Sequence, residues 1–407
     1  MAPLGRSPWA ARGGNPRDVR RHNLGILLGH LHSSAPLSRA ELTQRMGLNR
    51  STIAGLVSQL TELGLVEEER PAGTRAGAGR PSLVVRLRPQ GVHVLAVDIG
   101  VDRATVGLVG LGGRVVARRG TRFRPSASPA VVAAAVRRLV EALLDDPVGY
   151  GAPIVGMGVA LPAVVRRPDG FIRFAPNLGW VDQPLGELLA VQLMDVLRGH
   201  RVQVGNDADL GVLAEHLRGA AVGENDVVFI MGGVGVGGGC IVGGVPLTGA
   251  GGYAGEVGHL PVVPGGRSCR CGARGCWETV IGEPAIARAL GQRSADVDEL
   301  VQAVHAAAGS GALDAVACHL GRGLAAVVNL LNPRLVIIGG VLGEVFGAAR
   351  DAVRAALDAT ALTASADQVQ LALPRLGADA VLVGASELAW EELLADPVAV
   401  MTGVPVL

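Results

Sequence analysis

The sequence predicts an α/β protein in which a small N-terminal winged helix-turn-helix domain precedes a larger body of two α/β lobes. Three observations support this fold class. Short helical patterns separated by glycines extend as far as Gly64, two alternating segments follow them, and strands then alternate with helices from residue 91 onward. At 407 residues the chain is long enough for two or three domains with cores of their own.

Residues 1–20 are expected to form a disordered basic tail, because they contain several arginines and no apolar segment of signal-peptide length follows them. The segment 23–31 has leucines at helical spacing and predicts the first helix. Ser38 and Glu41 then form a capping box that begins a second helix, which Gly47 ends.

Asn49 can cap a third helix over residues 50–62, whose apolar side chains share one face. Two short helices joined by a glycine turn, the second starting with polar and basic residues, are typical of a helix-turn-helix. Segments 65–67 and 83–87 alternate like two strands of a wing, so we expect a DNA-binding domain over residues 21–88. The expected DNA contacts lie at the starts of the second and third helices and at the wing tip: Ser38, Arg39, Asn49, Arg50, Ser51, Thr52, Arg75 and Arg80.

Charge is distributed unevenly along the chain. All 37 basic residues are Arg, 36 residues are acidic, and the formal net charge is +1. Residues 1–90 hold 13 Arg and 6 acidic residues, whereas the remainder holds 24 Arg and 30 acidic residues. A proteome-wide preference for Arg explains the missing Lys but not this segregation, which indicates a basic module that meets a polyanion. The alternative for the first 90 residues is an ordinary helical bundle with a solvated hairpin.

Composition also excludes several classes of protein. Aromatic residues make up only 3% of the chain, which argues against an RNA-binding protein that stacks bases on Phe and Tyr. The uncharged segment 227–247 is long enough to suggest a membrane span, but eight of its residues are Gly, and turns suit it better. Five Cys, three of them clustered, favour a reducing compartment, so we expect a cytoplasmic protein without a membrane partner.

The body of the chain reads as alternating strands and helices. We expect strands over residues 92–98, 104–109, 154–160, 202–204, 227–231 and 335–340, a hairpin over 163–174, and helices over 130–144, over 315–331 and from Glu344. Asn206, Asp207 and Asp209 follow one of the strands, at the end of a parallel sheet where ligands bind in open α/β folds. We place the two lobes at residues 91–205 and 206–407, with the C-terminal helix packing back on the first lobe.

The sequence predicts a metal site between the last strands. Its ligands would be one imidazole and three thiolates: His259, Cys269, Cys271 and Cys276. This set satisfies the tetrahedral nitrogen and sulfur preference of zinc and leaves no position for water, so the predicted Zn²⁺ is structural. The alternative is a group of reduced free thiols.

These motifs together resemble the ROK family, which contains bacterial sugar kinases and sugar-responsive repressors. The resemblance rests on Glu256-Val257-Gly258-His259, the Cys269–Glu278 segment, Asp98-Ile99-Gly100, Asn177-Leu178-Gly179-Trp180, Asn206-Asp207, Gly235-x-Gly237, Asn332-Pro333 and Gly339-Gly340. It implies a two-lobed, actin-like and sugar-kinase-like (ribonuclease H-like) ATPase-type fold. The N-terminal winged helix makes the chain resemble the repressor branch of the family. Most kinases of the family lack such a domain.

The resemblance also implies a sugar site between the two lobes. Its residues would be Asn177, Asn206, Asp207, Glu256, His259 and Glu278. Carboxylates and amides suit this role, because they bond sugar hydroxyls in fixed directions. His259 could bind zinc through one nitrogen and sugar through the other.

The same resemblance predicts that kinase activity is lost. Asp207 stands where the kinases have their catalytic base, but the phosphate-binding loops differ. Val101 and Asp102 place a branched and a negative side chain where the kinases approach a phosphate, and Val234 replaces a hydroxyl residue. We therefore expect no catalytic residues and no enzyme, but a homodimeric or homotetrameric repressor of carbohydrate-utilisation genes that binds a palindromic operator and a monosaccharide or sugar derivative. The alternatives are an ATP-dependent sugar kinase with an appended DNA-binding module and a DNA-bound scaffold with a degenerate pocket.

Overall fold

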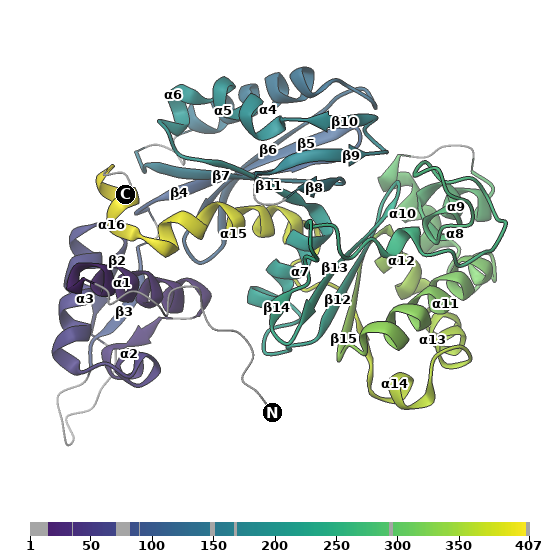
Figure 1. The fold of residues 1–407 in the computed structure, drawn as a ribbon. Coiled ribbons are helices and arrows are strands. Elements are labelled where there is room, and N and C mark those ends of the chain that lie inside the picture. The colour runs from purple at the N-terminus through teal and green to yellow at the C-terminus, as the bar shows by residue number, and fades with distance from the viewer. Residues whose placement is uncertain are drawn as a thin grey trace. The chain divides into compact units, whose positions relative to one another are not determined.

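The computed structural model describes residues 15–34, 36–70, 82–88, 90–146, 151–166, 169–292 and 296–403 (Figure 1). The chain divides into two compact units. Unit 1 comprises residues 1–93, 110–112 and 390–407, and unit 2 comprises residues 94–109 and 113–389. Each unit is described here by itself.

Unit 1 contains a winged helix-turn-helix. Its elements are α1 (Pro16–Ser33), β1 (Leu37–Ser38), α2 (Arg39–Met46), α3 (Arg50–Glu62), β2 (Val66–Glu69) and β3 (Val84–Leu87). The first helix begins at Pro16, so the tail expected over residues 1–20 was drawn too long. Asn15 accepts a hydrogen bond from the Arg17 amide, and proline at the first helical position is already shaped for a helix, which explains the earlier start.

The helix cap and the glycine turn predicted for this domain are present in the structure. Ser38 and Glu41 make a complete capping box, and Gly47 ends α2 in the left-handed conformation at φ 64°. Strands β2 and β3 pair antiparallel with Val66 opposite Leu87, and β1 adds a third strand that the sequence analysis did not predict. The buried leucines of α1 and the apolar face of α3 form the core of the domain: Leu24, Leu27, Leu28, Leu31, Ile53, Leu56, Val57 and Leu60.

The C-terminal end of the chain belongs to unit 1. Helix α15 (Ala380–Ala395) contributes its last residues to this unit, and α16 (Pro397–Thr402) packs against α1. The Trp390 ring lies edge-on to His32, with their centroids 5.9 Å apart. Gly25 lies so close to α15 that an added Cβ would stand 2.2 Å from the Leu394 carbonyl oxygen. Residues 390–407 therefore complete the DNA-binding unit rather than the second lobe, to which the sequence analysis assigned them.

The first lobe of unit 2 is a five-stranded sheet in the order β11-β7-β4-β5-β6. Its strands are β4 (His93–Ile99), β5 (Arg103–Gly110), β6 (Arg114–Arg122), β7 (Ile154–Leu161) and β11 (Val202–Asn206). Helices α4 (Pro129–Leu144), α5 (Leu185–Gln192) and α6 (Met194–Leu197) accompany it. Met157 and Val159 of β7 enter the core shared with α4, whereas Gly156 and Gly158 point the other way, toward the backbone of α15.

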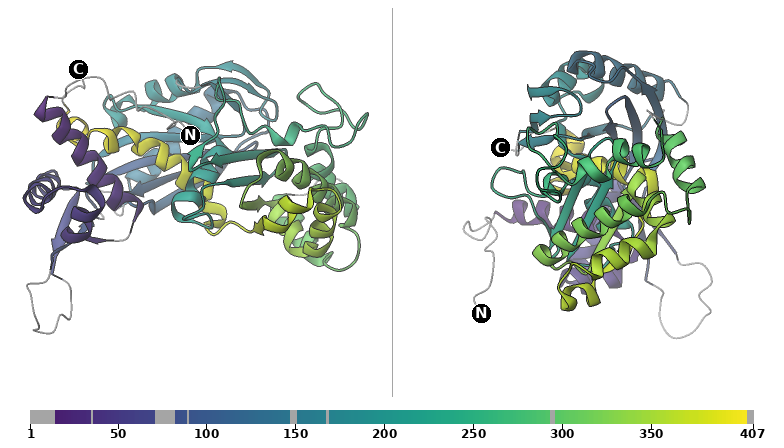
Figure 2. Two further views of the ribbon diagram at one scale, coloured as in Figure 1. Left: turned by 60° about the horizontal axis from the view of Figure 1, so that its bottom comes forward. Right: turned by 90° about the vertical axis from the view of Figure 1, so that its right-hand side faces the viewer.

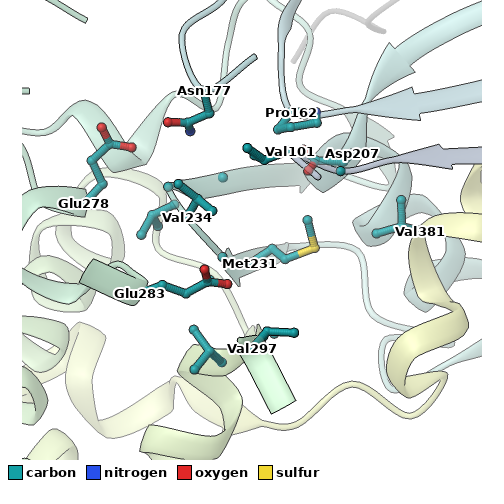
Figure 3. Close-up of a pocket in the computed structure, with 18 of the residues that line it drawn as sticks. Val101, Pro162, Asn177, Asp207, Met231, Val234, Glu278, Glu283, Val297 and Val381 are labelled. Carbon is teal, nitrogen blue, oxygen red and sulfur yellow. The ribbon is translucent and has the colours of Figure 1, made fainter. Parts of the chain in front are cut away.

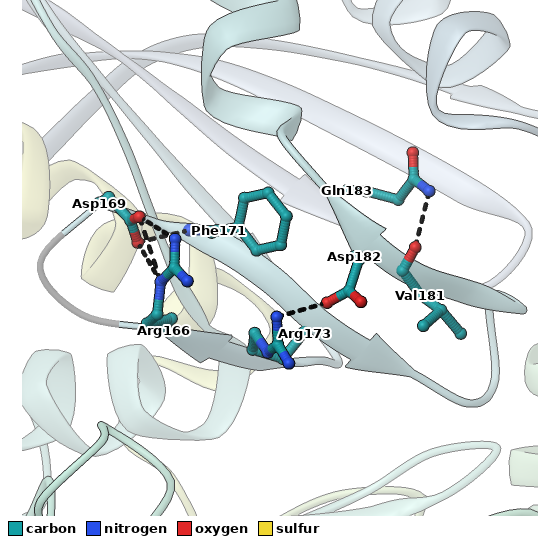
Figure 4. Close-up of polar contacts among 7 residues, drawn as sticks. All are labelled: Arg166, Asp169, Phe171, Arg173, Val181, Asp182 and Gln183. Atoms are coloured by element: carbon teal, nitrogen blue, oxygen red, sulfur yellow. Dashed lines mark hydrogen bonds and ion pairs between the residues drawn. The ribbon is translucent and has the colours of Figure 1, made fainter.

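A small sheet extends the first lobe toward the cavity described below. Strands β8 (Val164–Arg166), β9 (Phe171–Ala175) and β10 (Trp180–Gln183) pair antiparallel in sequence order. An ion pair between Arg173 and Asp182 (2.7 Å) ties β9 to β10, and Arg166 pairs with Asp169 across the turn between β8 and β9 (Figure 4). The turn that follows β9 carries Asn177.

The second lobe repeats the strand order of the first. Its sheet runs β14-β13-β12-β15-β16, with β12 (Val227–Gly232), β13 (Val236–Val242), β14 (Val245–Pro246), β15 (Leu335–Gly340) and β16 (Gln370–Ala372). Phe229 of β12 packs in a core with α7 (Asp207–Arg218), while Val228 and Ile230 enter the core on the other face of the sheet, which helices cover. Figure 2 shows these helices in green on one side of the lobe. Those helices are α8 (Glu278–Ile281), α9 (Glu283–Ala289), α10 (Val297–Ala306), α11 (Asp314–Leu331), α12 (Val341–Ala348), α13 (Arg350–Asp358) and α14 (Thr363–Gln368).

The glycine-rich segment that the sequence analysis weighed as a membrane span belongs to the sheet of the second lobe. Residues 227–247 form β12, β13 and β14 with a tight turn, as their glycines indicated. Among the described helices, α11 is long and apolar enough to cross a membrane, but half of it is buried inside the lobe, as in the core helix of a globular domain.

The helix expected from Glu344 begins at Val341, directly after Gly340, whose φ of 60° turns the chain out of β15.

Candidate functional site

A cavity of unit 2 is lined by every residue that the resemblance assigns to a sugar site. Its volume is about 990 Å³. Six of its lining residues are those predicted from the sequence: Asn177, Asn206, Asp207, Glu256, His259 and Glu278. They come from the turn after β9, the junction of β11 and α7, the short 3-10 helix Val257–His259 and the start of α8. Figure 3 shows Asn177, Asp207 and Glu278 among the residues that line the cavity.

Asn206 and Asp207 are fixed by the start of α7. The Asn206 amide oxygen accepts hydrogen bonds from the amides of Ala208 (2.8 Å) and Asp209 (3.1 Å), and its amide nitrogen donates to the Ala163 carbonyl (3.1 Å). The helix cap therefore uses the oxygen, and one amide hydrogen of Asn206 is left for a ligand. Asp207 is only 8% exposed and accepts a hydrogen bond from the Ala208 amide (2.8 Å).

Two carboxyl groups share this part of the cavity, that of Asp207, which is buried, and that of Asp98, which is half-buried. Burial and, to a smaller extent, the negative charge of Asp98 together raise the pKa of Asp207 to about 7. Burial likewise raises the pKa of Asp98 to about 6, against the opposing influence of Arg103. A carboxyl group poised near neutral pH can accept a proton or a hydrogen bond from a sugar hydroxyl, and this chemistry suits either a binding site or a general base.

The four predicted metal ligands lie together. Their ligand atoms are all within 4.8 Å of one another. The Sγ atoms of Cys271 and Cys276 are 3.7 Å apart, and Cys269 Sγ is 3.7 Å from His259 Nδ1. A tetrahedral zinc ion with Zn–S bonds of about 2.3 Å separates its sulfurs by about 3.8 Å, so this donor set fits the metal. His259 turns Nδ1 toward the cysteines, and its other ring nitrogen, Nε2, is 3.7 Å from Glu256 Oε2.

Two further contacts join the cysteine loop to the cavity. Cys269 Sγ is 2.8 Å from Glu278 Oε1, and Arg270 donates a hydrogen bond to the Asn177 side-chain oxygen (2.9 Å). Gly235 makes room for this arrangement, because an added Cβ would lie 2.7 Å from polar atoms of both Asn177 and Glu278. The sequence analysis missed Arg270, whose partner is 93 residues away in the chain and carries no local signal.

The other part of the cavity contains the residues that the sequence analysis placed in the altered phosphate-binding loops, together with charged residues that it did not single out. It is lined by Val101 and Asp102, by Val234 and by Glu283, and also by the arginines Arg103, Arg122 and Arg288. Burial raises the pKa of Glu283. Asp296, at the start of α10, forms an ion pair with Arg122 of β6 at 2.5 Å, so a residue of the second lobe meets one of the first.

The predicted DNA-contact residues group at the ends of two helices of unit 1. Asn49 caps α3 by accepting from the Thr52 amide (2.8 Å) and the Ser51 hydroxyl (2.7 Å), while Arg50 is exposed. Ser38 is engaged in the capping box of α2. The Arg39 guanidinium makes two 2.5 Å bonds to the Glu68 carboxylate of β2, so a DNA contact would have to compete with that pair. Arg75 and Arg80 lie outside the described residues.

Comparison with known proteins matches the N-terminal domain and the body of the chain to two different families. Residues 94–392 match the ROK family and residues 25–76 match the MarR family. The xylose repressor of Bacillus spizizenii is 25% identical over 92% of this chain and 97% of its own length. The glucokinase of Thermotoga maritima is 33% identical, but over 64% of this chain and 87% of its own.

A solved structure shows the same fold along nearly the whole chain. The crystal structure of a ROK family transcriptional regulator, a homologue of the E. coli MLC protein, covers 95% of this chain and 100% of its own with a TM-score of 0.76 at 24% identity. The predicted fold class is confirmed by this likeness and by the duplicated strand order. With most of its length matching one family and an N-terminal winged helix matching another, the chain belongs to the ROK family and carries a MarR-type DNA-binding domain.

Proposed function

We propose that this protein is a DNA-binding transcriptional regulator, a repressor of carbohydrate-utilisation genes, whose affinity for its operator is changed by a sugar bound in the cavity of unit 2. One observation carries the proposal: a winged helix and a cavity lined by six polar side chains occur in one chain that xylose repressors match over 92% of its length. The sugar would be a monosaccharide or a derivative of one.

The arrangement of α3 supports DNA binding. Its first turn presents Arg50, Ser51 and Thr52, and a helix start of this kind can read base edges in the major groove. A homodimer or homotetramer would present two such helices to a palindromic operator. Arg75 and Arg80 are proposed as wing contacts from the sequence alone.

Sugar binding is supported by the directions of the polar groups. The carboxylates accept hydrogen bonds, the amides accept and donate them, and a buried set of both rejects analogues that lack a hydroxyl. We propose that Zn²⁺, held by His259, Cys269, Cys271 and Cys276, fixes the loop carrying two of these groups. When bound, the metal supplies structural cross-linking and leaves no open position for catalysis.

Loss of kinase activity is part of the proposal. Phosphoryl transfer depends on positioning and on stabilising the charge of the phosphates. The cavity instead places Val101, Asp102 and Val234 on its wall, and its arginines are each paired with or hydrogen-bonded to groups of the protein. We therefore assign no catalytic residue and expect the protein to act in the cytoplasm as a sensor.

The test is a gel-shift or fluorescence-anisotropy titration of the purified full chain on DNA from upstream of its own and neighbouring genes. Glucose, xylose, N-acetylglucosamine and their derivatives are then added in turn. We expect one of them to shift operator affinity by at least about fivefold, the lower range of allosteric coupling. If no sugar alters binding or melting temperature, the protein is a DNA-bound scaffold and the proposed sensing is wrong.

One observation favours a second candidate function. Asp207 is retained, buried and has a raised pKa, as a kinase base would be. A coupled ADP-release assay over the same sugars tests for an ATP-dependent sugar kinase with an appended DNA-binding module. Turnover that Asp207→Asn abolishes would establish the kinase and refute the sensor.

A further inference from the structure

We propose that Arg270 is a positioning residue of the sugar site, which turns the side-chain amide of Asn177 so that its nitrogen donates a hydrogen bond to one hydroxyl of the sugar. The inference rests on the proposed function, because it assigns the direction of one bond to that same ligand. Arg270 is not among the described residues that line the cavity, whereas Asn177 is, so Arg270 acts through Asn177.

The chemistry of the contact determines which way the amide faces. Arg270 Nη1 lies 2.9 Å from Asn177 Oδ1. A guanidinium group has five donors and no acceptor, so only the amide oxygen can accept its hydrogen bond, and a flipped amide would set two donors against each other. The Asn177 amide is therefore held with its oxygen on Arg270 and its nitrogen on the other side.

The amide nitrogen of Asn177 lies at the cavity wall. A Cβ placed on Gly235 would stand 2.7 Å from Asn177 Nδ2 and 2.7 Å from Glu278 Oε2, and all three residues line the cavity. Figure 3 shows Asn177 and Glu278 on the same side of it. The site thus presents a donor beside an acceptor, a pair that matches the acceptor and the donor of one sugar hydroxyl or of two neighbouring ones.

The backbone around Asn177 is already held, so the orientation of its side chain is what Arg270 sets. Leu178 and Trp180, which follow Asn177, are both buried. The Trp180 indole nitrogen also donates to the Ala127 carbonyl (2.8 Å). The side-chain torsions of Asn177 are the freedom that remains at this turn, and a bond that selects one amide orientation lowers the entropy lost when the sugar binds.

The position of Arg270 depends in turn on the cysteine loop. Arg270 stands between two of the proposed metal ligands, Cys269 and Cys271, and the Gly272 amide donates to the Cys269 carbonyl (3.1 Å) to close a tight turn around it. This loop belongs to the second lobe and Asn177 to the first, so a single bond joins the two sides of the cavity. Order in the metal loop is thereby passed to a side chain that meets the sugar.

Isothermal titration calorimetry with the full chain tests the inference. Glucose, xylose and N-acetylglucosamine identify the sugar that the parent protein binds most tightly, and its deoxy analogues, each lacking one hydroxyl, locate the bond. We expect Arg270→Ala to weaken binding of this sugar about five- to tenfold, the contribution of one hydrogen bond. The analogue without the hydroxyl that Asn177 meets should bind the parent and Arg270→Ala equally, within about twofold.

A double-mutant cycle assigns the loss to Asn177. Asn177→Ala should lose at least as much affinity as Arg270→Ala, and combining the two should cost no more than Asn177→Ala alone. Arg274→Ala is the matched control and should leave affinity within about twofold, because this arginine of the same loop donates to the Ser268 hydroxyl (3.1 Å) instead. Melting temperature and metal content are measured for every variant and should match the parent in Arg270→Ala.

The outcomes separate the two levels of the proposal. Unchanged affinity in Arg270→Ala, a loss that adds to that of Asn177→Ala, an equal loss for every deoxy analogue, or a loss that accompanies unfolding or release of the metal would each overturn the role of Arg270 and leave a sugar sensor in place. If no sugar binds the parent chain or alters its operator affinity, the proposed function itself fails.

Discussion

At the scale of single residues, the neighbouring carboxyl groups of Asp98 and Asp207 both have a raised pKa, which makes the stability of the protein depend on pH. The folded protein holds the pKa of Asp207 at about 7, well above the 3.8 of an unperturbed aspartate, mainly through burial. Between these two values the folded state retains a proton that the unfolded state releases. The stability linked to this group is therefore fully present below pH 3.8 and is lost as the pH rises through about 7.

Asp207→Asn should consequently stabilise the protein, and more so at pH 8 than at pH 5. Asparagine keeps the oxygen that accepts from the Ala208 amide but carries no charge that burial can destabilise. We expect a gain of about 1–3 kcal/mol at pH 8, visible as a rise of several degrees in melting temperature. Scanning fluorimetry at both pH values measures it. The exposed Asp298 provides the control as Asp298→Asn, and a variant that melts lower than the parent at pH 8 would contradict the burial argument.

A second residue-scale prediction concerns the cysteine cluster. In the absence of metal, burial and the nearby Glu278 raise the pKa of Cys269, so the thiol stays protonated at neutral pH unless a cation binds. Cys271→Ser should remove one metal per chain in elemental analysis, lower the melting temperature by several degrees and weaken the response of operator binding to sugar. Cys318→Ser, on α11 and outside the cluster, is the matched control. A metal-free Cys271→Ser protein with the full sugar response would remove zinc from the proposal.

At the scale of elements, α3 separates residues that build the helix from residues that are free to read DNA. Asn49 satisfies the helix start, so its replacement would alter stability and recognition together. Arg50 is exposed beside it and belongs to the same turn. Within the described helix α3, Arg50 therefore offers a clean test of recognition.

Arg50→Ala should weaken operator binding without destabilising the domain. Loss of one specific contact to a base costs about 1–3 kcal/mol, equivalent to roughly 5- to 150-fold in affinity. Anisotropy titrations and thermal melts measure the two effects. Arg114→Ala, an exposed arginine at the start of β6, should leave operator affinity unchanged. An equal loss on unrelated DNA would show that Arg50 contacts phosphate rather than a base.

Helix α15 is the element whose residues belong to both units. In unit 2, Gly384 lies against α7, where an added Cβ would be 2.0 Å from the Leu210 carbonyl oxygen, and Glu387 pairs with Arg218 of α7 at 2.5 Å. In unit 1, the end of the same helix packs Trp390 on His32. Helix α15 therefore contributes residues to each unit, and in unit 2 it contacts the helix that begins at Asp207.

Glu387→Gln should therefore reduce the ratio between operator affinities measured with and without sugar. The Glu387 side chain is 4% exposed, and its loss leaves the Arg218 charge without full compensation, which costs up to roughly 3–5 kcal/mol. The measurement is the sugar-dependent shift in operator affinity at a temperature where the variant is folded. Asp195→Asn, which breaks an exposed pair with Arg137, is the control. An unchanged ratio in Glu387→Gln would exclude α15 as the coupling element.

At the scale of the whole molecule, the segregation of charge predicts two different salt dependences. The basic N-terminal part should bind DNA largely by releasing counterions, and for six or more phosphate contacts affinity falls roughly 10³-fold between 50 and 200 mM salt. Sugar binding in the mildly acidic body involves a neutral ligand and should change little over the same range. Titrations of both ligands across that series test this, and parallel losses would contradict it.

Much of this architecture was predictable because its signals are local. The capping box of α2, the Asn49 cap of α3, the glycine turns and the alternating strands predicted the winged helix, and the spacing of His259 and the Cys residues predicted the cysteine cluster. Contacts between distant segments had no such signal. Arg270 on Asn177, Arg122 on Asp296 and the closure of unit 1 by Trp390 each join residues that only the fold brings together.

The membership of Trp390 in unit 1 has a consequence for the order in which the protein is made. The winged helix leaves the ribosome early, but the helix that completes its unit follows about 300 residues later. At about 5–20 residues per second, this interval lasts roughly 15–60 s, during which most of the cavity-bearing body is synthesised. Both units are completed only when α15 has been made, because this helix supplies Ala380 and Val381 to the cavity wall and Trp390 to the DNA-binding unit.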